Sequence, residues 1–208
     1  MHECVGIINY GLGNLASVVN AFEYIDIPVQ ILSSADQLRK VSHAILPGVG
    51  AFGKGMANIK DNGWDKAIFD HAIEQKKPLL GICLGMQLLA TTSEELGVYE
   101  GLNLLPGQVK KIVQQDDICI PHVGWNSVEQ RNNAKTYENM AMPDDFYFVH
   151  SYVFCPEDEQ HISGMTMHGQ NFVSSVESNN IWGVQFHPEK SQGAGLAILK
   201  NFWNYKPC

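Results

Sequence analysis

The sequence predicts an α/β fold, in which a doubly wound parallel sheet is extended by antiparallel strands. Two observations support this prediction. Strand-like and helix-like segments alternate between residues 4 and 92, whereas the segments after residue 102 are mostly strand-like and separated by turn residues. The chain has 208 residues, 45% of them hydrophobic and 17% charged, a size and composition that suit one globular domain. We therefore expect residues 1–208 to form a single domain.

The alternating half contains short apolar runs bounded by glycine, proline or polar residues, and these indicate strands at 4–10, 28–32, 43–47 and 78–82. Apolar residues at helical spacing indicate helices at 12–25, 34–41, 64–75 and 85–92. Strands and helices in turn are typical of a parallel sheet with helices on both faces, as in flavodoxin-like folds.

The second half of the sequence predicts antiparallel strands that extend this sheet. Strand-like runs occupy 107–113, 146–154, 163–168, 171–177 and 181–188. A helix at 193–205 closes the chain. The sequence contains neither an internal repeat nor a linker, which agrees with one domain.

Charge and hydropathy exclude several classes of protein. The net charge is −8, so the basic face needed for contacts with nucleic acid is not expected. No apolar run reaches membrane-spanning length, which argues against a membrane protein. The N-terminus "MHECVGIINYG" lacks the basic and apolar regions of a signal peptide. We therefore expect a cytoplasmic protein.

The five cysteines are widely spaced and include no C-x-x-C pair, so neither a zinc site nor a disulfide framework is indicated. The histidines also lack ligand spacing, and we expect no metal and no other cofactor. Cys4, Cys119 and Cys155 are interpreted as small buried hydrophobes and Cys208 as a terminal bystander. Cys83 differs from the other four and is the candidate nucleophile.

Cys83 lies in "PLLGICLGMQLLA", residues 78–90, between an expected strand and an expected helix. The G-x-C-x-G pattern has the form of a nucleophile elbow with cysteine in place of serine. Gly81 and Gly85 leave room for a sharp turn, and the following helix N-terminus favours the thiolate. A structural cysteine on a tight turn is the alternative, which the two glycines disfavour.

His187 is the candidate base for this nucleophile. It lies in "WGVQFHPEKS", after an apolar strand, and Glu189 follows closely enough to orient the ring. His150 also ends an expected strand and His122 is a third candidate, but neither has a carboxylate shortly downstream. We interpret these two as structural or substrate-side residues.

Acyl transfer also requires donors for the developing oxyanion. The stretch "LPGVGAFGKG" follows the third expected strand, and the amides of Val49 and Gly50 are candidate donors. The amide of Leu84, just after the nucleophile, is another. The stretch lacks the G-K-[ST] of a phosphate loop, and "YGLGNL" is too short for a dinucleotide fingerprint.

The segments "PGVG", "GICLGMQLL" and "QFHPEKS", in this order, resemble the class I (triad) glutamine amidotransferases. The resemblance implies that Cys83 forms a γ-glutamyl thioester, that His187 is the acid and base, and that Glu189 orients it. It also implies that the substrate L-glutamine is held by Gln87, Glu95, Ser151 and Tyr152. The sequence leaves open that Gln87 and Glu95 are solvated residues at a helix end.

Further segments, "NYGLGNL", "PHVGWN" and "YFVHSY", look like the branch of this family that supplies ammonia to imidazole glycerol phosphate synthase in histidine biosynthesis. This resemblance implies a heterodimer with a (β/α)8 cyclase barrel. It also implies that the partner interface contains Trp125, Asn126, Tyr147 and Lys190. Because free glutaminase activity would waste glutamine, we expect the partner to activate the chain, for example by moving the "PGVG" loop.

A paralogous branch is also similar, in "LLATTSEELGVYEGLNLLPG" and "HPEKSQGAGLAILKNF". Its members supply ammonia for sugar amidation in surface-polysaccharide pathways, with the same glutamine chemistry. Two other classes stay open. A redox sensor or chaperone-like protein would need Cys83 but not His187 or Glu189, and a free-standing cysteine hydrolase would cleave other amides. The aromatic residues of "PHVGWN" and "YFVHSY" suit a docking face and favour the amidotransferase.

Overall fold

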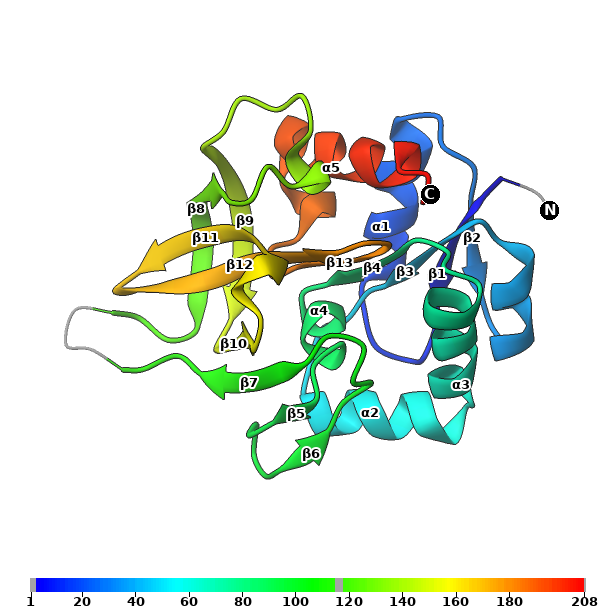
Figure 1. The fold of residues 1–208 in the computed structure, drawn as a ribbon, viewed down its shortest axis with the longest axis horizontal. Coiled ribbons are helices and arrows are strands. Elements are labelled where there is room, and N and C mark those ends of the chain that lie inside the picture. Colours follow the sequence, from blue (N-terminus) through cyan, green and yellow to red (C-terminus); the bar gives the residue numbers. More distant parts are fainter. Residues whose placement is uncertain (1–2, 115–117, 208) are drawn as a thin grey trace.

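The structure is a computed structural model that describes residues 3–114 and 118–207. Five parallel strands form one side of its larger sheet, in the spatial order β2-β1-β3-β4-β13 (Figure 1). Their bounds are β1 Val5–Ile8, β2 Val29–Leu32, β3 His43–Leu46, β4 Leu79–Ile82 and β13 Ile181–Val184. Numbered along the chain, this order is the 2-1-3-4-5 arrangement of flavodoxin-like sheets, so the predicted fold class is confirmed.

Antiparallel strands extend this sheet in the order β12-β11-β8-β9. They are β8 His122–Gln130, β9 Asp144–His150, β11 Ile162–His168 and β12 Gln170–Ser178. A smaller sheet has the order β10-β7-β5-β6. Its strands are β5 Thr92–Ser93, β6 Tyr99–Glu100, β7 Gly107–Lys111 and β10 Tyr152–Pro156.

Helices cover both faces of the parallel strands (Figure 1). One face carries α1 Leu15–Tyr24 and α5 Gln192–Asn204, and the other carries α2 Phe52–Asp61, α3 Trp64–Phe69 and α4 Leu84–Leu88. Short helical turns are η1 Ala35–Lys40, η2 Asp70–Glu74, η3 Lys135–Tyr137, η4 Glu159–His161 and η5 Pro188–Lys190. Strands β1, β3, β4 and β13 are buried throughout, which explains their continuous apolar sequences.

Several expectations about individual elements were wrong, among them the strand expected at 181–188, which ends at Val184. The run 146–154 is two strands in different sheets, which separate at Ser151. Strand β8 and helix α2 lie where no element was expected, and the helix expected at 85–92 ends at Leu88. Glycines obscure the pattern of α2, yet Gly55 lets this helix pack closely on Leu88. Neither this packing nor the change of sheet at Ser151 leaves a local periodic signal.

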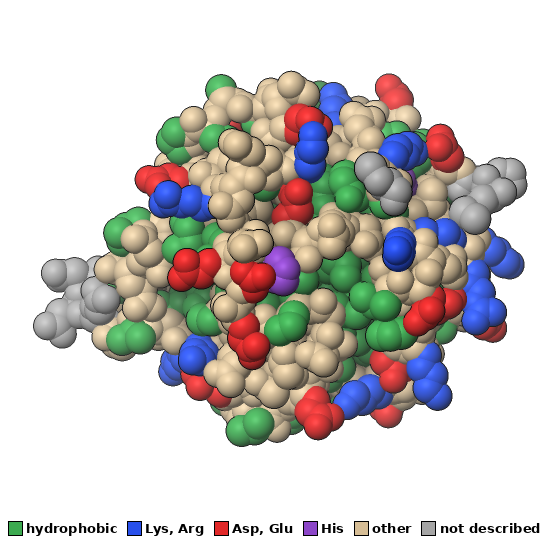
Figure 2. All heavy atoms as spheres, viewed as in Figure 1, with side chains coloured by type: hydrophobic (Ala, Val, Ile, Leu, Met, Phe, Trp, Pro, Cys, Tyr) green, Lys and Arg blue, Asp and Glu red, His purple; other side chains and the backbone are tan. Residues whose placement is uncertain are grey.

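The interpretation of the minor cysteines was also partly wrong. Cys119 and Cys155 are exposed and Cys4 is half-buried, while Cys208 lies outside the described residues. On β10, Val153 and Phe154 are buried, whereas Cys155 near the end of the strand is exposed. No helix among the described residues is long and apolar enough to cross a membrane. On the face shown in Figure 2, acidic and basic side chains are interspersed.

Candidate active site

Cys83 occupies the corner between β4 and α4, at the carboxyl edge of the parallel strands. Its φ of 53° and ψ of −109° are a conformation that residues with a side chain rarely adopt. The backbone amide of Cys83 donates to the carbonyl of Val184 on β13, at 2.8 Å. This bond ties the corner to the neighbouring strand. The strained geometry is what the elbow pattern in the sequence predicts.

The two glycines that flank the corner are required by space. A Cβ atom on Gly85 would overlap the carbonyl oxygen of Leu46 on β3. A Cβ atom on Gly81 would lie 2.7 Å from the carbonyl carbon and oxygen of Gly85. Helix α4 can therefore start directly against strands β3 and β4 only because both positions are glycine.

His187 and Glu189 form a buried pair just beyond the end of β13. The imidazole Nδ1 lies 2.8 Å from a carboxylate oxygen of Glu189, and the two side chains are 2% and 3% exposed. The backbone amide of His187 donates to the carbonyl of Tyr147, and its carbonyl accepts from the Ser191 hydroxyl. The other ring nitrogen, Nε2, has no hydrogen-bond partner among the described residues. The pair thus presents one free nitrogen of an oriented ring.

The surroundings of His187 favour its protonated form. Burial of the ring opposes the imidazolium, but Cys83 and the Glu189 carboxylate favour it more strongly. Together they raise the pKa of His187 above its ordinary value. A cysteine, an imidazolium and a carboxylate are thereby assembled in the order that nucleophilic catalysis by cysteine requires.

The rival histidines are engaged in other contacts. Nδ1 of His150 lies 2.9 Å from the carbonyl of Tyr152, and its Nε2 lies 3.0 Å from Nδ1 of His122. Nε2 of His122 contacts the side-chain amide of Asn126 at 3.2 Å. Burial lowers the pKa of His150 to about 3 and that of His122 to about 4, so both rings are neutral. With every ring nitrogen occupied, neither has a free nitrogen for the thiol proton.

The loop after β3 lies beside this corner. The backbone amide of Leu84, an expected oxyanion donor, donates instead to the carbonyl of Gly48 at 3.3 Å. Val49 is 40% exposed. Gly50 has a φ of +114°, and a Cβ atom there would meet no atom within 4 Å. The candidate oxyanion loop is therefore exposed at Val49 and unhindered at Gly50, while its Gly48 carbonyl accepts a hydrogen bond from the Leu84 amide.

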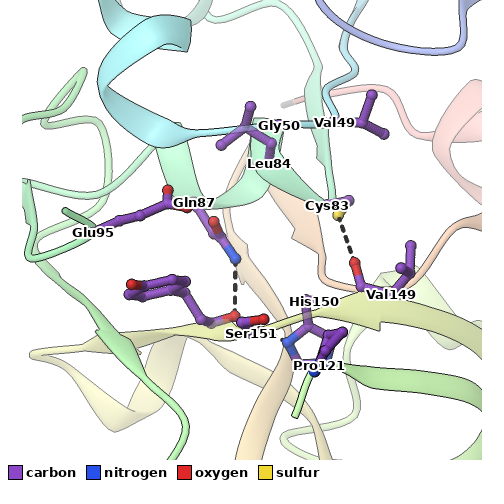
Figure 3. A pocket seen from close by; sticks show the side chains of 11 residues that line it. Val49, Gly50, Cys83, Leu84, Gln87, Glu95, Pro121, Val149, His150 and Ser151 are labelled. Carbon is purple, nitrogen blue, oxygen red and sulfur yellow. Dashed lines mark hydrogen bonds between the residues drawn. The ribbon is translucent and has the colours of Figure 1, made fainter.

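A pocket of about 300 Å³ opens above Cys83 (Figure 3). It brings together Cys83 with all seven expected oxyanion and glutamine-binding residues, and adds Pro121, Val149 and His150. The seven are Val49, Gly50, Leu84, Gln87, Glu95, Ser151 and Tyr152. The Cys83 thiol points toward the carbonyl of Val149, at 3.8 Å. Ser151 and Tyr152 reach the pocket because the chain changes sheets between β9 and β10.

Gln87 and Glu95 are not solvated residues at a helix end. Gln87 is 5% exposed, and its side-chain nitrogen donates to the carbonyl of Tyr152 and to the side chain of Gln185, both at 2.9 Å. A carboxylate oxygen of Glu95 accepts from the amide of Phe52, at the start of α2, at 2.6 Å. Glu95 thereby holds the end of the loop that follows β3.

Gln185 is a site residue that the sequence analysis missed. Its side-chain nitrogen lies 3.7 Å from the sulfur of Cys83, and its oxygen accepts from Gln87. Gln185 is fully buried. The available signal was a single amide side chain inside the apolar run "IWGVQF", because a buried polar group needs partners.

Three of the four expected interface residues form a cluster. Trp125 and Tyr147 are opposite each other on β8 and β9, with ring centroids 6.1 Å apart, and the Lys190 ammonium lies 5.7 Å from the Tyr147 ring centroid. Trp125 is 48% exposed. Asn126 lies on the other face of β8 and also donates to the carbonyl of Met167. The cluster is next to the catalytic candidates, since Tyr147 accepts from the amide of His187.

The described residues contain no group of three or more His, Cys, Asp or Glu side chains placed to hold a metal ion. The side chains and amides of the site offer a thiol, a proton carrier and hydrogen-bond donors beside a small pocket.

Comparisons with known proteins identify the family of this chain. The model of the family "Glutamine amidotransferase class-I" matches residues 6–205. Imidazole glycerol phosphate synthase subunit HisH of Moorella thermoacetica is 46% identical over 95% of this chain and 93% of its own length. The protein of the same name from Chlorobaculum tepidum is 43% identical over 95% and 98%.

Solved structures show the same fold at lower identity. PurLQS from Thermotoga maritima aligns with a TM-score of 0.77 at 19% identity and covers 99% of both chains. A glutamine amidotransferase from the same organism aligns with a TM-score of 0.65 at 19% identity, over 91% of this chain and 77% of its own. Given the family match over residues 6–205, this chain belongs to the class-I glutamine amidotransferases.

Proposed function

We propose that this chain is the glutaminase subunit of an imidazole glycerol phosphate synthase, a single domain that hydrolyses L-glutamine to glutamate and ammonia. One observation carries the proposal: Cys83, strained at its corner, lines a small pocket and lies beside the ring of the buried His187–Glu189 pair. The relatives named as synthase subunits, at 43–46% identity, support the histidine pathway. We also propose that the chain works in the cytoplasm.

In the first half of the reaction, the Cys83 thiolate attacks the side-chain carbonyl carbon of glutamine. The proton of the thiol resides on His187, whose raised pKa suits this role. As the tetrahedral intermediate collapses, the C–N bond breaks and the imidazolium gives its proton to the departing nitrogen. Ammonia leaves and a γ-glutamyl thioester stays on Cys83.

In the second half, neutral His187 removes a proton from water, and the resulting hydroxide attacks the thioester carbonyl. The C–S bond breaks, glutamate leaves and the thiolate is restored beside the imidazolium. Glu189 holds the ring orientation through its contact with Nδ1 in both halves. Substrate glutamine is held by the pocket residues Gln87, Glu95, Ser151 and Tyr152.

The ammonia requires a partner. In water it becomes protonated and loses its nucleophilicity, so it must pass directly to the site that uses it. We assign the partner as a (β/α)8 cyclase subunit, which makes imidazole glycerol phosphate and AICAR from its acceptor. The cluster of Trp125, Tyr147 and Lys190 is the proposed docking face, because exposed aromatic residues suit interfaces. Asn126 lies on the other face of β8 and is not part of this cluster.

The partner also activates the site in this proposal. The Leu84 amide is occupied by the Gly48 carbonyl, so it is not available to an oxyanion. Docking would bias the loop after β3 toward a conformation in which the amides of Val49 or Gly50 and of Leu84 face the substrate carbonyl. Glutamine hydrolysis then follows only when a recipient for ammonia is present.

The test is glutamate release from glutamine by the chain alone, and with the histidine-pathway cyclase plus its acceptor. Strong stimulation by the cyclase, lost in Cys83→Ala, is the expected result. A response to a sugar-amidating synthase instead of the cyclase would assign the chain to the polysaccharide branch. Undiminished activity in His187→Ala would contradict the triad and favour a protein that needs only the cysteine.

A further inference from the structure

Tyr10, at the end of β1, carries a buried hydroxyl with no hydrogen-bond partner in the described part of the chain. The side chain is 2% exposed. Burial, reinforced by nearby Cys83, raises the pKa of Tyr10, so the hydroxyl stays protonated and can donate. Buried hydroxyls are nearly always paired, so this one requires an explanation.

The hydroxyl lies against the candidate oxyanion loop. A Cβ atom on Gly48 would overlap the Tyr10 hydroxyl oxygen, and it would lie 2.9 Å from Cβ of Leu84 and 3.2 Å from the amide nitrogen of Gly85. Gly48 is therefore sandwiched between the phenol and the first turn of α4. The orphan donor is thus adjacent to the residue whose carbonyl occupies the Leu84 amide.

The proposed reaction needs the Leu84 amide to release the Gly48 carbonyl. Gly48 is buried, so its released carbonyl would lack a donor unless the protein supplies one. We propose that Tyr10 is a positioning residue of the glutaminase: its hydroxyl donates to the Gly48 carbonyl when that carbonyl leaves the Leu84 amide, which then binds the substrate oxygen. This inference rests on the proposed function.

This rearrangement leaves none of the three hydrogen-bonding groups, on Tyr10, Gly48 and Leu84, without a partner. In the present conformation the Leu84 amide is paired with Gly48 and the Tyr10 hydroxyl is unpaired. In the rearranged loop the Leu84 amide pairs with the oxyanion and the Tyr10 hydroxyl pairs with Gly48. Tyr10 thereby disfavours the resting loop, where it lacks a partner, and stabilises the active one.

The experiment compares Tyr10→Phe with the wild type in the complex with the cyclase and its acceptor. The variant keeps the ring and removes only the hydroxyl. We expect kcat for glutamate release to fall about 10-fold, the effect of one hydrogen bond lost in the active state, with KM for glutamine changed less than about twofold. Since the hydroxyl is unpaired at rest, the melting temperature should not fall.

Tyr137→Phe is the matched control. Tyr137 is also buried, but its hydroxyl lies 2.6 Å from the Ser175 hydroxyl in the antiparallel half of the molecule. This variant should lower the melting temperature and leave kcat unchanged. If Tyr10→Phe keeps the wild-type kcat, or loses activity only together with stability or glutamine binding, the inference is overturned while the proposed function stands. Absence of glutamate release by the wild-type complex, or its persistence in Cys83→Ala, overturns the proposed function and the inference with it.

Discussion

The corner after β4 and the loop after β3 end two adjacent parallel strands, yet they are built in opposite ways. At the corner, Cys83 is buried, its amide is bonded to Val184, and the flanking glycines leave no room for change. In the loop, Val49 is exposed and Gly50 has open space around it. The proposed nucleophile is thus fixed by the fold, whereas the loop that carries the candidate donors Val49 and Gly50 is open. In the proposed function, this difference explains how the triad stays idle until the partner docks.

The largest effect is expected from Cys83→Ala, which removes the nucleophile from the fixed region. Partner-stimulated glutamate release should fall by about 10⁶-fold, to background, because no thioester can form. The strained corner and its buried contacts remain, so cyclase binding and the unfolding midpoint should change little. Substantial residual hydrolysis would place the nucleophile elsewhere.

Glu189→Gln tests the orientation of the base. The amide cannot stabilise the imidazolium, and we expect kcat to fall by roughly 10³–10⁴-fold with little change in KM. The measurement is steady-state glutamate release by the complex. Lys190→Gln, a change in the adjacent residue, should alter partner affinity but leave kcat at saturating cyclase within a small factor.

Glu189→Gln should also change how the free energy of unfolding depends on pH. Cys83 and Glu189 raise the pKa of His187 in the folded state, so the stabilisation from its proton is fully present below the unfolded pKa of about 6.5. It is lost as the pH rises through the raised folded pKa. The difference in unfolding free energy between wild type and Glu189→Gln should therefore be largest near about pH 6 and shrink toward alkaline pH. A pH-independent difference would contradict the raised pKa.

Gly85→Ala and Gly50→Ala contrast the two regions directly. At Gly85 the new methyl group would overlap the Leu46 carbonyl in a region that cannot relax, so we expect a loss of more than about 4 kcal/mol in unfolding free energy, measured in urea. At Gly50 the methyl group meets nothing, and only the φ of +114° opposes it, for a loss of about 1–3 kcal/mol. Equal losses would show that the loop is as constrained as the corner.

Trp125→Ala tests how the loop is controlled. Truncation of an exposed aromatic anchor should weaken cyclase binding by about 10- to 100-fold while the chain's unstimulated hydrolysis stays unchanged. Tyr24→Ala is the control, because Tyr24 is 79% exposed at the end of α1, toward the opposite edge of the sheet. Equal binding by both variants would remove Trp125 from the docking face.

Much of the fixed region could be predicted from the sequence because its determinants are local. Glycines two residues on either side of Cys83, and Glu189 two residues after His187, encode the corner and the buried pair. The continuous apolar strands likewise indicate the parallel sheet. The resemblance to a known family then supplied the pocket residues, which the fold brings together around Cys83.

The features that were missed depend on distant parts of the chain. Gln185 matters because Gln87 and Cys83 lie across from it, and the break at Ser151 matters because its two strands join different sheets. The occupied amide of Leu84 is a contact with a loop 36 residues earlier in the chain, at Gly48. No local pattern encodes such contacts.

In the proposed function, the corner that holds Cys83 is complete in the free chain and only the loop after β3 is not. The rate at which iodoacetamide alkylates Cys83 tests this directly, and it is followed by mass spectrometry because Cys119 and Cys155 are exposed and react as well. The rate is compared with glutamate release in the same samples, with and without the cyclase and its acceptor. We predict that glutamate release rises by about 100-fold or more, the effect of one oxyanion donor, while the alkylation rate changes only a few-fold. Alkylation that rises in parallel with hydrolysis would show that the partner builds the nucleophile itself, and would contradict this account.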